Sequence, residues 1–123
     1  MAAGLTTVQK FMLYALGACT RQIEARLKVR HVTLAMTKAE FIRLVQRSHI
    51  VKQRERVLYQ HLQRLESQRY LAYGERTLSL TKRGGRVFER LNRDLSPYVE
   101  LTRILAKEDL LRALPGKQTR LAE

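Results

Sequence analysis

The chain has 123 residues, of which 45% are hydrophobic, so it can bury one compact core but is short for two ordinary domains. Its formal net charge is +13, from 24 lysines and arginines against 11 aspartates and glutamates. A surface this positive favours a polyanionic partner. We therefore expect a single domain over residues 1–123, with a core over about residues 30–94.

The excess positive charge is concentrated between Arg26 and Arg93, where 17 basic residues stand against 5 acidic ones. Arginine outnumbers lysine by 17 to 7, and the planar guanidinium suits bidentate contacts to phosphates and guanine edges. The composition thus favours a nucleic acid as the polyanion. The alternative is a solvated basic surface that serves solubility, which self-repulsion at this charge density opposes.

Several features indicate a location inside the cell. The single cysteine, Cys19, lies among apolar residues and cannot form an intramolecular disulfide, as expected in a reducing compartment. No apolar run approaches the roughly 18 residues that a membrane span needs, and no secretory signal pattern stands at the N-terminus. We expect a cytoplasmic, nucleoid-associated protein with no membrane contact.

A capping box opens the first predicted helix. Thr6 and Gln9 have the spacing of that motif, and apolar residues then recur at intervals of three and four. The pattern predicts a terminal helix over about residues 6–28, interrupted only mildly by Gly17.

A second capping box, Thr37 with Glu40, predicts a helix that ends at about Arg47. Before it lies a short β-prone run, Val32-Thr33-Leu34, too brief to stand alone as a strand. We expect this run to pair with a distant segment.

The stretch Ser48–Lys52 breaks the helical pattern, and a third helix is predicted from about Gln53 to Gln68. Its apolar stripe consists of Leu58, Leu62 and Leu65. The two helices joined by a short turn are followed by a hairpin.

The hairpin is predicted from two β-prone runs, Tyr70–Tyr73 and Thr77–Leu80, which flank Gly74-Glu75-Arg76. Thr81 can cap a fourth helix, and Gly84-Gly85 is expected to relax the turn into it.

Ser96 followed by Pro97 predicts a new helix start, because serine caps helices and proline fits their first position. This C-terminal helix is expected over about residues 96–114 and is ended by Pro115-Gly116. The polar tail, Lys117–Glu123, is expected to fray.

Two segments carry a resemblance to a known family: Leu62-Gln-Arg-Leu-Glu-Ser-Gln-Arg-Tyr-Leu71 and Leu78-Ser-Leu-Thr-Lys-Arg-Gly84. They resemble the recognition-helix end, the wing and the leucine-threonine-x-x-glycine segment of prokaryotic (archaeal or bacterial) winged helix-turn-helix DNA-binding proteins. The resemblance covers about residues 37–91 and points to no subfamily. It implies a mainly α fold with a small β-hairpin wing, here with added N- and C-terminal helices. One position departs from the pattern, because Arg69 stands where such proteins place glycine at the end of the recognition helix.

The outer face of the third helix carries the residue types that read base edges. Arginine can fork onto guanine, glutamine onto adenine, and a major groove admits a helix. The alternative is that any amphipathic helix has a polar outer face. The candidates for base reading are Gln53, Arg56, Tyr59, Gln60, Gln63 and Arg64, with Tyr59 at the flank.

Basic residues around this helix are candidates for phosphate contacts that position the domain. The alternative for each of them, taken alone, is a solvent-exposed side chain without a partner. They are Lys38, Arg43, Arg47, Lys52, Arg54, Arg76, Lys82, Arg83 and Arg86.

No catalytic, cofactor or metal site is predicted. The histidines, His31, His49 and His61, share no metal-ligand spacing, and one cysteine cannot complete a zinc site. Carboxylates are sparse and have basic neighbours, so the sequence offers no pair of residues for general acid–base catalysis. We expect a protein that is not an enzyme and has no evident small-molecule ligand.

The terminal helices present more apolar surface than a three-helix winged core needs. Winged-helix regulators of similar size commonly dimerise through such helices, so the resemblance implies a homodimer, while packing over one monomeric core is the alternative. The expected function is binding of double-stranded DNA, as a transcriptional regulator or a chromatin-like protein. The alternative is an RNA-binding or protein-docking winged-helix module of a larger complex.

Overall fold

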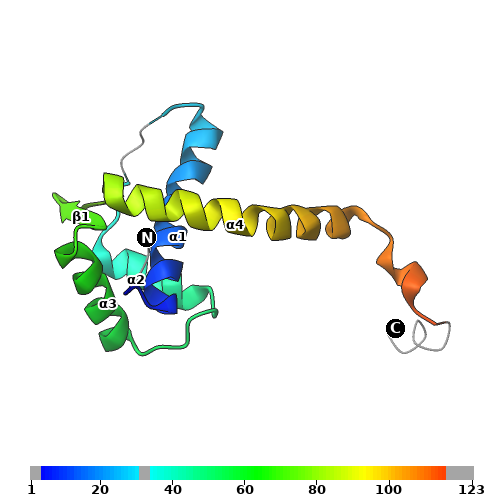
Figure 1. The fold of residues 1–123 in the computed structure, drawn as a ribbon, viewed down its shortest axis with the longest axis horizontal. Coiled ribbons are helices and arrows are strands. Elements are labelled where there is room, and N and C mark those ends of the chain that lie inside the picture. Colours follow the sequence, from blue (N-terminus) through cyan, green and yellow to red (C-terminus); the bar gives the residue numbers. More distant parts are fainter. Residues whose placement is uncertain (1–3, 31–33, 116–123) are drawn as a thin grey trace. The chain divides into compact units, whose positions relative to one another are not determined.

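The computed structural model describes residues 4–30 and 34–115. Within these ranges the chain is mainly helical, with one two-stranded antiparallel hairpin, as expected for the fold class (Figure 1). The elements in chain order are α1 (Thr7–Leu27), α2 (Lys38–Arg47), α3 (Glu55–Ser67), β1 (Leu71–Gly74), β2 (Thr77–Leu80), α4 (Lys82–Lys107) and the short 3₁₀ helix η1 (Leu110–Ala113).

The chain divides into two compact units, Met1–Asn92 and Arg93–Glu123, and the boundary falls within α4. The first unit holds the core, and the second contains the end of α4 and η1. None of the helices in residues 4–30 and 34–115 has both the length and the apolar character that crossing a bilayer requires.

Both predicted capping boxes are present. The Thr6 hydroxyl accepts from the backbone N–H of Gln9 at 3.1 Å, and Gln9 Oε1 accepts from the backbone N–H of Thr6 at 3.1 Å. Thr37 and Glu40 make the same reciprocal pair: the Thr37 hydroxyl accepts from the Glu40 N–H at 3.1 Å, and Glu40 Oε1 accepts from the Thr37 N–H at 2.9 Å. Hydrogen bonding to Thr37, chiefly from its backbone N–H, lowers the pKa of the Glu40 carboxyl. The predicted starts of the first two helices are confirmed.

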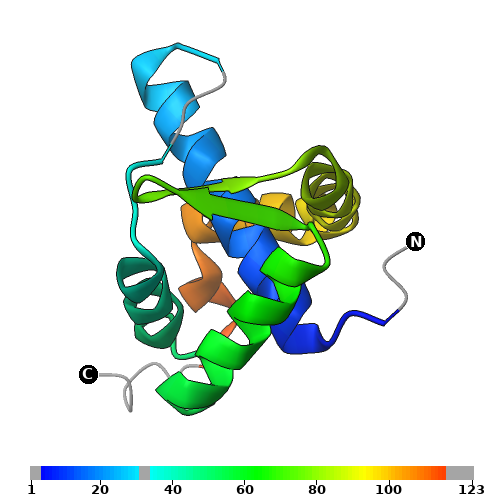
Figure 2. The ribbon, with the colours of Figure 1, turned by 90° about the vertical axis from the view of Figure 1, so that its left-hand side faces the viewer.

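The core lies between α1, α2, α3 and the hairpin. Figure 2 looks onto α3, with α2 beside it and the hairpin beyond its C-terminal end. Leu58, Leu62 and Leu65 are buried as predicted. The largest fully buried side chains of the other elements are Met12, Leu13, Leu16, Phe41, Ile42, Val45, Leu71 and Leu78.

The third helix begins two residues later than predicted. Its N-cap is Arg54, which has extended backbone and makes no side-chain capping bond, so Gln53 lies in the connection from α2 and not on the helix. The predicted start was wrong because no capping residue stands there to mark it. The connection also contains His49 in a left-handed conformation, at φ +58°.

The third helix ends with Arg69 in the left-handed conformation, at φ +65°. The backbone N–H of Arg69 donates to the carbonyl of Glu66 at 3.0 Å, and that of Tyr70 donates to the carbonyl of Leu65 at 2.9 Å. These two bonds define a Schellman motif, in which glycine is the usual residue at the position of Arg69. The motif forms here in spite of the arginine.

The hairpin has a two-residue turn. Its strands pair from Leu71 with Leu80 to Gly74 with Thr77. Only Glu75 and Arg76 lie between them, both with positive φ, at +53° and +59°, as a type I′ turn requires. The predicted three-residue connection was therefore one residue too long, because Gly74 belongs to the ladder.

The expected pairing before the second helix is found at Leu34. Leu34 forms an isolated antiparallel bridge with Leu78 of β2, and its carbonyl accepts from the Leu78 N–H at 3.3 Å. Val32 and Thr33 lie outside the described residues.

The predicted helix start at Ser96 was wrong, because α4 runs through Pro97 without interruption. Proline inside a helix removes one backbone hydrogen bond but keeps φ near the helical value. The fixed φ of Pro97 is compatible with both a helix start and a continuous helix, although in a continuous helix the proline ring crowds the preceding turn. After Lys107 the chain forms η1 in place of further α-helix, and Gly116 and the tail lie outside the described residues.

Candidate nucleic-acid interface

The outer face of α3 is exposed and polar. Arg56, Gln60, Gln63 and Ser67 follow one another at spacings of four, three and four residues, which places them on one side of the helix, opposite the leucine stripe. Arg64 is also exposed and lies next to this row. The five side chains point away from the core, as the sequence predicted.

Two of the predicted base-reading residues do not share this face. Gln53 is exposed, but it precedes the helix. Tyr59 is half-buried and packs against the core cluster, so its ring contributes to the fold. Sequence periodicity placed Tyr59 at the flank of the helix, and packing against the core cluster occupies that flank.

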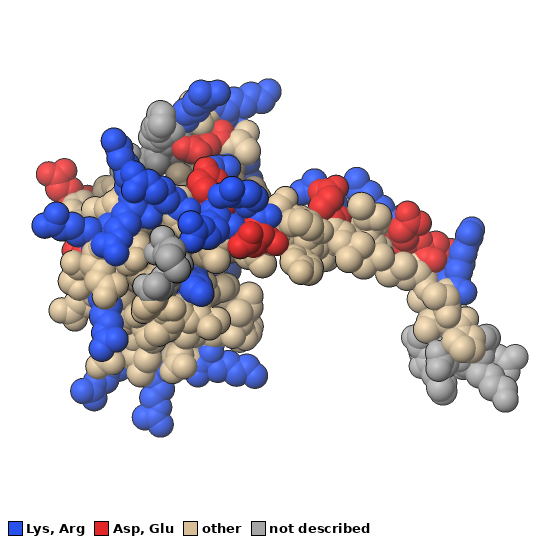
Figure 3. Space-filling model, in the orientation of Figure 1, with Lys and Arg blue, Asp and Glu red and all other residues tan. Residues whose placement is uncertain are grey.

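The predicted phosphate-contacting residues are distributed around the first unit. Figure 3 shows lysine and arginine side chains gathered over the hairpin and the first half of α4. Exposed members of the set are Arg43 and Arg47 on α2, Lys52 and Arg54 before α3, Arg76 in the hairpin turn, and Lys82, Arg83 and Arg86 on α4.

Lys38 is already engaged within the protein. Its ammonium group lies 2.6 Å from Glu66 Oε1 of α3 and 5.1 Å from the ring centroid of Tyr73. Its side chain is only one-third exposed. Lys38 therefore joins α2 to α3 and the hairpin, and its charge is compensated.

Arg83 is also bonded to its own chain. Its Nη1 donates to the carbonyl of Gln68 at 2.8 Å, and its Nη2 donates to the hydroxyl of Tyr70 at 3.0 Å. The guanidinium carbon lies 4.2 Å from the Tyr70 ring centroid. Arg83 thus ties the start of α4 to the end of α3, a role that its sequence position did not indicate.

Further bonds fix this junction. The Thr81 hydroxyl donates to the carbonyl of Arg69 at 2.5 Å and accepts from the backbone N–H of Gly84 at 3.1 Å, which caps α4 as predicted. A Cβ added to Gly84 would lie 1.8 Å from the carbonyl oxygen of Tyr70, whereas one added to Gly85 would meet open space. The expectation that both glycines relax a turn is corrected for Gly84, which is required for close packing.

His61 is connected to α1 through a buried glutamine. Gln9 is 2% exposed, and its Nε2 lies 3.0 Å from His61 Nδ1. Because Gln9 Oε1 already accepts from Thr6, its amide nitrogen must face the ring, and His61 Nδ1 accepts that hydrogen bond. Burial of the ring, and then the charge of Arg64, lower the pKa of His61. His61 lines an open hollow of about 570 Å³ on α3, together with Gln60, Gln63 and Arg64.

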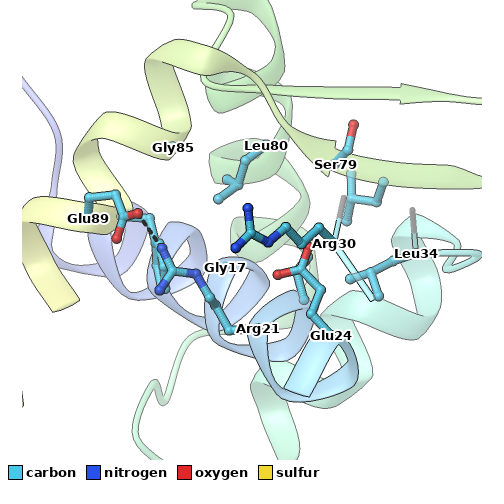
Figure 4. Close-up of a pocket in the computed structure, with 12 residues that line it drawn as sticks. Gly17, Arg21, Glu24, Arg30, Leu34, Ser79, Leu80, Gly85 and Glu89 are labelled. Atoms are coloured by element: carbon cyan, nitrogen blue, oxygen red, sulfur yellow. Dashed lines mark hydrogen bonds and ion pairs between the residues drawn. The ribbon is translucent and has the colours of Figure 1, made fainter. Parts of the chain in front are cut away.

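A second hollow, of about 660 Å³, lies between α1, β2 and α4 (Figure 4). Arg21 forms an ion pair with Glu89 across it, and the Arg21 guanidinium lies 5.3 Å from the ring centroid of Phe88. Figure 4 shows the side chains of Glu24 and Arg30 directed into the same space. Two arginines and two glutamates make its lining electrically balanced.

Among the described residues, no cluster of three or more histidine, cysteine, aspartate or glutamate side chains could hold a metal ion. His31 lies outside that range. Comparison with known proteins gives no family model, no curated protein and no solved structure that matches this chain.

Proposed function

We propose that this protein binds double-stranded DNA as a winged helix-turn-helix protein, without catalysis. In this proposal α2 and α3 are the helix-turn-helix pair, α3 enters the major groove, and the hairpin is the wing. The observation that carries the proposal is the exposed row of Arg56, Gln60 and Gln63 on α3.

The electrostatic setting supports the same function. Glu66, an acidic residue of α3, is compensated by Lys38, which leaves the outer face positive. Exposed basic residues lie before α3, in the hairpin turn and at the start of α4. Arginine and lysine in such positions bind phosphates and fix the orientation on the duplex, while α3 reads base edges. Arg83 and Lys38 act mainly by holding the elements together.

The experiment is a comparison of affinities for duplex DNA, duplex RNA and single strands over a range of salt concentrations. We expect the tightest binding to duplex DNA, with a steep loss of affinity at high salt because bound counterions are released. Equal affinity for duplex RNA would instead favour the RNA-binding alternative. The α3 face lacks exposed aromatic rings that stack on bases, which argues against single strands.

A selection from a pool of random duplexes separates a sequence-specific regulator from a chromatin-like protein. If a preferred site emerges, Arg56→Ala or Gln60→Ala should cost about 1–3 kcal/mol at one base position and little elsewhere. Arg26→Ala, on the exposed last turn of α1, removes an equal charge without touching the α3 face. Equal effects of Arg56→Ala and Arg26→Ala would contradict the role given to α3.

We further propose that a second copy of the chain covers the C-terminal unit. Every residue from 93 to 115 is exposed. Leu95, Tyr98 and Leu105 lie at helical spacings along α4, with Thr102 between them, and form an apolar stripe. An isolated helix with such a stripe is marginal in water unless a partner buries it.

Charge favours a second copy as that partner. Residues 93–115 contain four basic and four acidic side chains, so they are neutral, whereas the whole chain carries +13. Two copies therefore repel least where these segments meet. The double variant Leu95→Asp with Leu105→Asp should be monomeric in light scattering, while Arg26→Asp, which makes the same change of net charge outside this segment, should match the wild type. A monomeric wild type would exclude the dimer without affecting the DNA-binding proposal.

A further inference from the structure

We infer that Tyr70, Arg83, Arg86 and Arg90 form a phosphate-binding site that holds the nucleic-acid backbone beside α3, an inference that rests on the proposed function. The composition of the hollow, its rigid floor and its position at the end of α3 support this assignment.

The hollow has a volume of about 340 Å³, and its lining contains three arginines and no carboxylate. Arg83, Arg86 and Arg90 lie at spacings of three and four residues, so their side chains leave the same side of α4. Val87 and Tyr70 complete the lining. Like charges held this closely repel one another unless an anion compensates them.

Two of the three arginines use none of their side-chain donors within the described ranges. Arg86 and Arg90 are exposed, and neither makes an ion pair or side-chain hydrogen bond with another residue of the described ranges. Glu89, the nearest acidic residue along α4, is bonded to Arg21 of α1. Arg86 and Arg90 lie about 6 Å apart along the helix axis, so both can reach one phosphate or two neighbours.

The floor of the hollow is fixed before any ligand arrives. Tyr70 is 3% exposed, and its hydroxyl accepts from Arg83 Nη2. Arg83 is held by Gln68 and by the Tyr70 ring, and two of its five N–H donors are used in these bonds. Gly84 rests against the Tyr70 carbonyl, so the backbone there cannot shift freely. A site built this way loses little entropy when an anion binds.

The position of the hollow favours a backbone phosphodiester over a free anion. Arg83 reaches the carbonyl of Gln68, the residue directly after α3, so the hollow lies at the C-terminal end of the proposed reading helix. A duplex in contact with the outer face of α3 would present its backbone at that end. Sequence reasoning assigned phosphate contacts to Arg83 and Arg86 but missed Arg90 and Tyr70, because the site forms only when α4 packs on the end of α3.

The test is the salt dependence of duplex DNA binding, measured by fluorescence anisotropy on the full chain. The slope of log affinity against log salt falls by about 0.9 for each phosphate contact removed. We therefore expect Arg86→Ala with Arg90→Ala to flatten the slope by about two. The control pair, Arg26→Ala with Lys28→Ala, removes the same charge from exposed positions at the end of α1 and should keep the wild-type slope. Thermal unfolding checks that both pairs remain folded.

Three outcomes overturn the inference, and they are distinguishable. If the Arg86→Ala, Arg90→Ala double variant still binds DNA with the wild-type salt slope, the phosphate site is refuted and the proposed function is unaffected. The hollow is assigned to a free anion if stoichiometric inorganic phosphate displaces all of the DNA and also shifts the NMR signals of the Arg86 and Arg90 Nε–H groups away from their positions in the ligand-free protein. Absence of any duplex binding by the wild type refutes the proposed function itself.

Discussion

The backbone of Gly17 in α1 lies directly against the ring of Phe88 in α4. A Cβ added to Gly17 would stand 2.3 Å from Phe88 Cδ1 and 2.7 Å from Cε1. Phe88 is 4% exposed, and its ring is also 5.7 Å from that of Tyr14. The missing side chain at Gly17 is what allows α4 to approach α1 closely enough to bury this ring.

Gly17→Ala should therefore destabilise the protein by about 1–3 kcal/mol in chemical denaturation, because the added methyl group overpacks the contact with Phe88. Gly85→Ala is the matched control, since a Cβ there meets nothing within 4 Å. The control should gain up to about 1 kcal/mol from helix propensity. Equal effects of the two substitutions would show that the α1–α4 contact is looser than described.

Arg69→Gly should raise the free energy of unfolding by about 1 kcal/mol. Arg69 has φ +65° at the end of α3, a conformation that costs an L-residue about 1–2 kcal/mol and glycine little. Urea denaturation measures the change, and Arg69→Ala serves as the control because alanine keeps the Cβ. The prediction fails if the glycine and alanine variants are equally stable.

Arg83→Ala should lower the free energy of unfolding by about 1–2 kcal/mol, because it removes two hydrogen bonds and the contact with the Tyr70 ring. Arg86→Ala, three residues away with no partner in the described ranges, should stay within about 0.5 kcal/mol of the wild type. Weaker DNA binding by the Arg83 variant alone would therefore be a poor measure of phosphate contact. Denaturation curves of both variants decide whether Arg83 has this structural role.

Stability should fall as the pH drops below the ordinary pKa of histidine. The pKa of His61 is lowered in the folded protein, so the unfolded chain binds a proton in a range of pH where the folded chain does not. The free energy of unfolding therefore decreases as the pH falls from about 6.5 to the lowered pKa of His61 in the folded protein. Below that pKa, His61 causes no further decrease. Protonated His61 would also lose the hydrogen bond from Gln9.

Denaturation at about pH 7.5 and about pH 5.5 measures this dependence. His61→Gln is the informative variant, because its side-chain oxygen can still accept from Gln9 but does not titrate. The variant should lose part of the difference between the two pH values. If the difference is the same with and without His61, another group causes it.

The sequence determined those features that depend on neighbours along the chain. Thr6 with Gln9 and Thr37 with Glu40 fix two helix starts through bonds that span three residues, and the leucine stripe of α3 fixes its buried side. The hairpin was likewise evident, as was the polar outer face of α3, because an outer face is simply the side opposite the leucines.

Only the tertiary structure decided which polar residues are free to bind a partner. Lys38, Arg83 and Arg86 are all basic residues that the sequence alone does not distinguish. In the structure, Lys38 is bonded to Glu66, and Arg83 to Gln68 and Tyr70. The role of Gly17 as a contact surface and the gathering of arginines beside Tyr70 depend on α4 crossing distant elements. Such contacts are set by packing between segments far apart in the chain, whose distances and angles no local pattern of residues contains.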